Sequence, residues 1–175
     1  MSTAADNLDF GFDLKQLTLS SEADTGKWFT ALKGKMEFKV TSTTSKGYKR
    51  NAVSTMRRLQ KTTGKDMNEL PLETLEDTTA SLLAKNALRG WSTLVPQAAA
   101  EKAGLASRTT YNSDGKATPD GFVLIDYAIY DGKPLEFTVD NAKKLLESVP
   151  DVNEEVSSLA GNKEQFYAGG ADSLD

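Results

Sequence analysis

The first periodic pattern along the chain is an alternation of apolar and charged residues. Its members are Met36, Phe38 and Val40 on one side and Glu37 and Lys39 on the other. A period of two is typical of a β-strand with one buried face. Another apolar run begins at Trp28, which we expect in the core, and a glycine-bearing turn at residues 33–35 separates the two runs. The pattern therefore predicts a β-hairpin over residues 28–40.

Apolar residues spaced three and four apart predict the helices. The longest stripe of this kind runs from Thr74 to Val95 and includes Trp91, which we expect in the core. A basic helix is expected before it, over residues 48–63, with Ser45 as its N-cap and Gly64 at its end. Further helices are expected over residues 97–105, from Thr138 to the residue before Pro150, and from Asp151 to Phe166.

The segment between these helices has a different character. Residues 107–121 are rich in turn formers, and the β-branched and aromatic run Phe122–Tyr130 predicts one strand, which the Asp131-Gly132 pair ends in a tight turn. The fold class is therefore predicted as α+β, with an N-terminal β-hairpin packed against a mainly helical bundle. We expect residues 1–24 to form a flexible arm, residues 25–167 a single domain and residues 168–175 an acidic tail.

The amino-acid composition excludes several kinds of catalytic and metal site. The 175 residues include neither cysteine nor histidine, which excludes disulfides, thiolate metal sites and Ser-His-Asp or Cys-His catalysis. Carboxylate sites for magnesium or calcium remain open, but no spacing points to one, and no glycine-rich phosphate loop is present. We therefore expect a protein that is not an enzyme and that holds no cofactor or metal. Neither an apolar run of membrane-spanning length nor a secretory signal is evident, so we expect a cytoplasmic protein without a membrane partner.

The net charge of −4 hides a strong asymmetry. Residues 27–65 carry 11 lysines and arginines but one acid, a local net charge of +10, whereas residues 66–175 sum to −10. Three interpretations stay open: contact with nucleic acid, association of copies with basic face against acidic face, or an ordinary solvated surface. If the basic region binds a partner, the candidate contact residues are Lys33, Lys35, Lys49, Arg50, Arg57 and Arg58.

Several short motifs occur in a recognisable order. A Trp-bearing strand pair and a basic helix precede the run Leu83-Ala84-Lys85-Asn86-Ala87-Leu88-Arg89-Gly90-Trp91. An Asp-Gly turn, the segment Pro134-Leu135-Glu136-Phe137-Thr138, a helix with Asn141-Ala142 and a terminal Phe166 follow. This order, from Lys27 to Tyr167, resembles the tail assembly chaperones of siphophage-type bacteriophages. The family passes from the Trp to the Asp-Gly turn by a short loop, so residues 96–130 stand as an inserted strand and loop region.

The resemblance implies a non-enzymatic role. Proteins of this family bind the tape-measure protein, keep it soluble and help recruit tail-tube subunits, and many also exist in a frameshifted longer form. It implies residence in the host cytoplasm during virion assembly, with the tape-measure and tail-tube proteins as partners. Self-association is a further expectation, whereas nucleic acid is not an expected partner. The alternative is a structural virion protein, as a minor component of the tail or of the head–tail connector.

Overall fold

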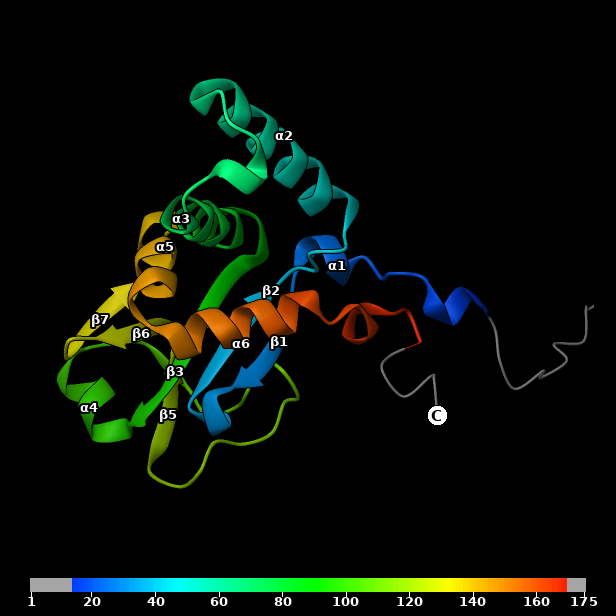
Figure 1. Ribbon diagram of the computed structural model, residues 1–175. Helices are drawn as coiled ribbons and strands as arrows, with labels where there is room; N and C mark the ends of the chain where they lie inside the picture. The colour runs from blue at the N-terminus through cyan, green and yellow to red at the C-terminus, as the bar shows by residue number, and fades with distance from the viewer. Residues whose placement is uncertain (1–13, 170–175) are drawn as a thin grey trace, which may run out of the picture.

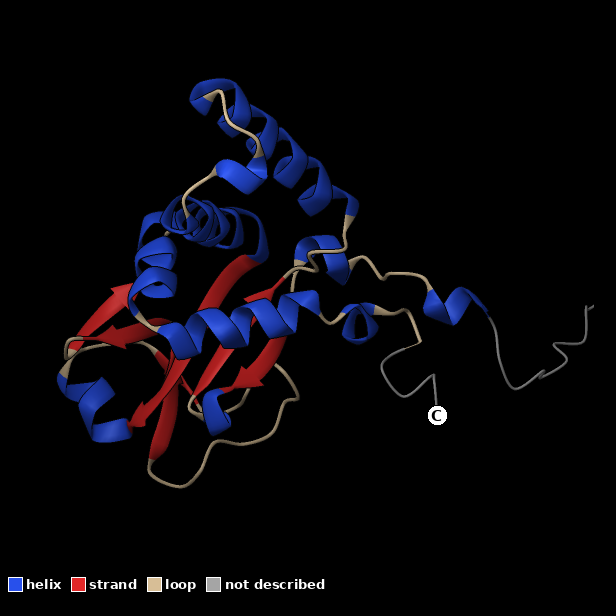
Figure 2. Ribbon diagram, in the orientation of Figure 1, coloured by secondary structure: helices blue, strands red, loops and turns tan. Residues whose placement is uncertain are grey.

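A computed structural model describes residues 14–169 of the chain, and its centre is an antiparallel sheet of five strands. The strands are β1 (Lys27–Ala31), β2 (Met36–Val40), β3 (Leu88–Pro96), β4 (Ser107–Arg108) and β5 (Phe122–Ile125), in the spatial order β1-β2-β3-β5-β4. A separate two-stranded sheet pairs β6 (Tyr127–Tyr130) with β7 (Lys133–Glu136). Figure 2 shows the sheets in red, framed by helices.

Helices cover the main sheet and extend beyond it. The α-helices are α1 (Glu22–Thr25), α2 (Lys46–Thr63), α3 (Leu72–Leu82), α4 (Gln97–Lys102), α5 (Val139–Ser148) and α6 (Pro150–Gly161). Short 3-10 turns η1 (Leu14–Leu17), η2 (Leu32–Gly34), η3 (Met67–Glu69) and η5 (Lys163–Phe166) and a π-helical turn η4 (Leu83–Ala87) complete the chain. In Figure 1, α6 crosses in front of the sheet, while α2 stands out at the upper edge of the molecule. Within residues 14–169, no helix is long and apolar enough to cross a membrane.

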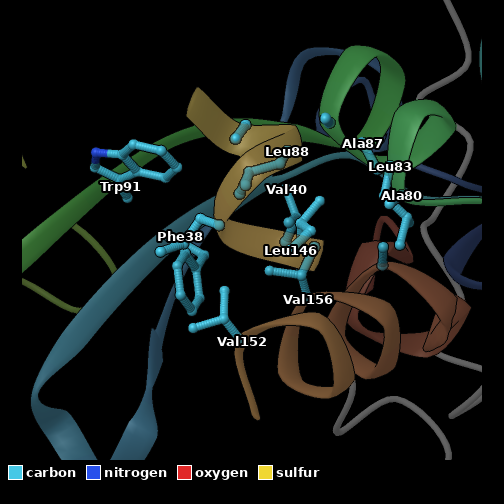
Figure 3. Close-up of a cluster of buried hydrophobic side chains, with 14 of the residues drawn as sticks. Phe38, Val40, Ala80, Leu83, Ala87, Leu88, Trp91, Leu146, Val152 and Val156 are labelled. Atoms are coloured by element: carbon cyan, nitrogen blue, oxygen red, sulfur yellow. The ribbon is translucent and has the colours of Figure 1, made fainter. Parts of the chain in front are cut away.

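The main core lies between one face of the sheet and helices α3, α5 and α6. Phe38 of β2 faces its cross-strand partner Trp91 of β3, and both side chains are fully buried. Figure 3 shows them together with residues that the helices contribute, among them Leu146 of α5 and Val156 of α6. Burial of this apolar surface is the main source of stability for the fold.

A β-bulge explains why the long helix predicted from Thr74 to Val95 is wrong. The chain is helical only as far as Ala87, and from Leu88 it becomes the central strand β3. Val40 pairs with Leu88 and Phe38 with Trp91, so two residues two apart on β2 face two residues three apart on β3. The extra residue keeps both apolar side chains of β3 on the core face, and it produces the spacing of three that is typical of a helix.

The other predicted helices are present, and they pack on a five-stranded sheet in which the predicted hairpin forms two of the strands. Residues 96–130 supply two strands of that sheet, since β5 pairs with β3 and β4 pairs with β5. The single strand predicted over Phe122–Tyr130 is in fact two strands in two different sheets, with Asp126 between them. The α+β class itself is confirmed, as is the N-terminal hairpin, in which Ala31 pairs with Met36.

Other local predictions are confirmed. Ser45 caps α2 by accepting a hydrogen bond from the Tyr48 amide, and Gly64 ends that helix in the left-handed conformation. Asp131 and Gly132 both have positive φ, as a tight β6–β7 turn requires. Thr138 caps α5. The last helix, predicted over Asp151–Phe166, begins at Pro150 and ends at Gly161, and Phe166 lies in the separate turn η5.

The predicted arm and tail coincide only partly with the described residues. Residues 1–13 and 170–175 lie outside them. Within the predicted arm, residues 22–25 form α1, where Ala23 is buried and its carbonyl accepts a hydrogen bond from the Ser42 amide. Leu19 also forms an antiparallel bridge with Tyr167. This end of the arm is therefore part of the folded domain.

Candidate functional site

The most prominent candidate surface is helix α2, an amphipathic helix at the edge of the domain (Figure 1). Its half-buried residues, Tyr48 among them, recur at helical spacing, and Tyr48 packs against the main core. Burial raises the pKa of the Tyr48 phenol. None of the 18 residues of α2 is fully buried, so the helix lies on the domain rather than within it.

Four of the six predicted contact residues lie together on the exposed side of α2. Lys49, Arg50, Arg57 and Arg58, joined by Lys61, line an open hollow of about 980 Å³ along the helix. Val53 lies among them with half of its surface exposed. Between Lys46 and Lys65 the chain carries seven cations and no acid, and none of the seven forms an ion pair with any described residue. This basic face of α2 can attract an anionic partner surface.

The other two predicted contact residues are not part of this face. Lys33 and Lys35 are exposed at the turn between β1 and β2. Figure 1 places that turn at the lower end of the hairpin, far from α2 at the upper edge. The structure therefore divides the predicted contact residues into a group of four and a group of two.

An acidic surface lies on the helices that follow α2. Glu73, Glu76 and Asp77 of α3 line a second open hollow, of about 920 Å³, with Glu147 of α5 and Glu154 of α6. Leu72 lines it as well and is 70% exposed. The sequence showed only that this half of the chain is acidic. The α3 members lie three and four residues apart, and that spacing is the signal for a shared helical face.

One lysine partly neutralises the charge of this acidic groove. Lys143 Nζ lies 2.6 Å from Asp77 Oδ1 and 3.4 Å from Glu147 Oε1. The hydrogen bond from Lys143 lowers the pKa of Asp77, and the same bond raises the pKa of Lys143. Glu73, Glu76 and Glu154 form no ion pair with any residue of the described chain.

A polar cluster that sequence reasoning missed lies on the other face of the sheet. Glu37, predicted to be on the polar face of its strand, is fully buried there, because residues 109–121 cover it. Its Oε2 accepts a hydrogen bond from Arg108 Nη2 at 2.9 Å, and its Oε1 accepts one from the Ser113 amide at 2.8 Å. Arg108 also binds Ser92 Oγ and the Asp126 carboxylate.

This cluster ties the sheet to its covering loop. Ser92 Oγ donates to Asp126 Oδ1 at 3.0 Å, but the Ser92 side chain is fully buried, so no substrate reaches it. Tyr111 donates from its hydroxyl to the Gly34 carbonyl at 2.9 Å, and desolvation together with the nearby Glu37 charge raises its pKa. Trp28, predicted in the core with Trp91, is half-buried on this same face, with its ring 6.0 Å from the Arg108 guanidinium.

Carboxylates do not gather into a metal site in the part of the chain that the structure describes. Among residues 14–169, no group of three or more acidic side chains is placed to hold a metal ion. Comparison with protein-family models, with curated protein sequences and with solved structures found no match. The basis for a proposed function is therefore the ordered motifs and the two charged surfaces described above.

Proposed function

We propose that this chain is a non-enzymatic assembly chaperone of phage tails, which binds and solubilises the tape-measure protein and helps recruit tail-tube subunits. It acts in the host cytoplasm while the virion is assembled. The tape-measure and tail-tube proteins are its partners. The proposal rests on the resemblance of the ordered motifs between Lys27 and Tyr167 to those of the tail assembly chaperones.

The observation that carries the proposal is that these motifs meet in one core. Trp91, which ends the Leu-Ala-Lys run, donates from Nε1 to the Leu135 carbonyl at 3.1 Å. Its ring also lies edge-on to Phe137, with 5.0 Å between the centroids. Both partners belong to the segment that follows the Asp-Gly turn. The ring centroid of the terminal Phe166 in turn lies 5.6 Å from that of Phe29 in the hairpin. Short motifs that contact one another support a shared architecture more strongly than the same motifs scattered on a surface.

The surface supports a binding role. The basic face of α2 is exposed and without ion pairs among the described residues, and it carries an exposed apolar residue, Val53, at its centre. Charged surfaces with an apolar centre serve association between proteins, because the charges select the partner and apolar burial adds affinity.

Co-expression with the tape-measure protein of the same phage tests the proposal. We expect the tape-measure protein to be insoluble alone and soluble, and co-purified, with this chain. Two charge-reversal variants, Arg57→Glu/Arg58→Glu and Lys33→Glu/Lys35→Glu, show which basic group contributes to binding. Each variant reverses two exposed cations of one group and leaves the other group intact. A tape-measure protein that stays insoluble with the wild-type chain contradicts the proposal. A fixed stoichiometry of this chain in mature particles favours the structural virion protein instead.

A further inference from the structure

The two charged surfaces of this chain are complementary to each other. The basic face of α2 carries five cations: Lys49, Arg50, Arg57, Arg58 and Lys61. The acidic groove formed by α3, α5 and α6 carries five acids: Glu73, Glu76, Asp77, Glu147 and Glu154. Lys143 pairs with Asp77 and Glu147, but acids remain in excess in the groove. Opposite charge on two surfaces guides two proteins into one register.

These surfaces do not neutralise each other within one molecule. The ion pairs of the described residues that involve the groove come from Lys143 of α5, and none joins α2 to α3, α5 or α6. Each surface also exposes an apolar side chain, Val53 on α2 and Leu72 beside the groove. Both surfaces are therefore available to a second molecule.

We propose that the basic face of α2 docks into the acidic groove of a second copy of this chain, in a head-to-tail contact. The 18 residues of α2 give a rod about 27 Å long, which spans several turns of charge along one side. A contact between two different patches leaves one basic face and one acidic groove unused at the ends, so copies can continue to add. The contact does not depend on the tape-measure protein.

Sedimentation or light scattering of the purified, nuclease-treated chain tests the contact. At low ionic strength we expect the weight-average mass to rise above the 18.9 kDa of one chain as the concentration increases. The weight-average mass should fall toward that of one chain at high salt, because salt screens charges on exposed surfaces. Neutralisation in Arg57→Gln/Arg58→Gln or in Glu73→Gln/Glu76→Gln should weaken association about tenfold.

Mixing the two variants tests the head-to-tail geometry. One variant keeps an intact groove and the other an intact basic face, so the mixture should form mainly a 1:1 dimer, about tenfold tighter than either variant forms alone. The matched controls remove the same charge elsewhere: Lys102→Gln/Lys133→Gln for the cations and Asp120→Asn/Glu136→Gln for the acids. All four of these control residues are exposed, and both controls should associate like the wild type.

A wild-type chain that stays monomeric at low salt overturns the proposal. So does an α2 variant or a groove variant that associates like the wild type, or a mixture that forms no dimer. A circular dichroism melt of each variant confirms that it is folded before its association is scored. An α2 variant that loses the tape-measure protein but still associates with itself would contradict this contact and leave the proposed function intact.

Discussion

Arg108 Nη2 lies 2.9 Å from Glu37 Oε2, which joins two residues 71 positions apart across one face of the sheet. The Glu37 side chain is completely buried, while that of Arg108 keeps 24% of its surface exposed. Buried charge is costly without a partner, so this contact explains how a buried glutamate is accommodated in β2. It also makes the loop over residues 109–121 part of the folded domain, because the Ser113 amide binds the same carboxylate.

Arg108→Met should lower the free energy of unfolding by about 2 kcal/mol, because it leaves the Glu37 charge buried with one remaining donor. Glu37→Gln/Arg108→Met should lose less than the sum of the two single variants, since it removes both charges together. Urea unfolding measures both effects. Lys116→Met is the matched control, because its ion pair with Asp114 is largely exposed and should contribute under about 0.5 kcal/mol. An equal loss of unfolding free energy in Arg108→Met and Lys116→Met would contradict a stabilising role for the buried Glu37–Arg108 pair.

The two tryptophans offer a direct comparison of the two sheet faces. Trp91 is 1% exposed and donates to the Leu135 carbonyl, whereas Trp28 is half-buried. Trp91→Phe should therefore cost about 2 kcal/mol of stability, because it opens a cavity and leaves a buried carbonyl without its donor. Trp28→Phe should cost under about 1 kcal/mol, since it removes a partly exposed ring and a weak cation–π contact. Thermal or urea unfolding of the two variants ranks them, and a larger loss at Trp28 would contradict the assignment of the main core.

The sequence predicted elements well where local signals decide them. Ser45 and Gly64 set the ends of α2, and Asp131-Gly132 sets the β6–β7 turn, since each residue acts through its own backbone or side chain. The strand β3 was missed because the pairing that defines it comes from distant strands, β2 and β5. Gly90 disfavours a helix there and the β-branched residues Thr93 and Val95 favour a strand, whereas the apolar spacing of three and four is typical of a helix.

The candidate surfaces were predicted unevenly for a similar reason. A run of cations within one helix is visible in the sequence, so the basic face of α2 was found. The acidic groove joins side chains from three helices, and the Glu37–Arg108 pair joins two segments of the sheet. Neither arrangement has a local signature, because only the packing of the elements brings those residues together.

Helix α2 should be the least protected of the long helices, because none of its residues is fully buried. Ser45→Ala removes the hydroxyl that accepts from the Tyr48 amide at 3.2 Å, and it should destabilise the start of α2 by about 1 kcal/mol. Hydrogen exchange should then quicken in α2 and stay unchanged in β2 and β3. Ser54→Ala is the control, since Ser54 is exposed within the same helix and alanine is the better helix former. Faster exchange in the sheet as well would show that α2 and the core open together.

The Asp77–Lys143 pair predicts a specific dependence on pH. The Lys143 hydrogen bond lowers the pKa of Asp77, so the pair stabilises the fold above the ordinary aspartate pKa. That contribution is lost as the pH falls through the lowered value. Lys143→Gln should raise the pKa of Asp77 toward its ordinary value, as measured by NMR titration of the carboxyl group, and should cost about 0.5 kcal/mol at neutral pH. Lys144→Gln removes the same charge one position away, where Lys144 lies over the Tyr130 ring instead, and it should leave the Asp77 titration in place. An equal change in both variants would mean that general charge, and not the 2.6 Å contact, sets the Asp77 pKa.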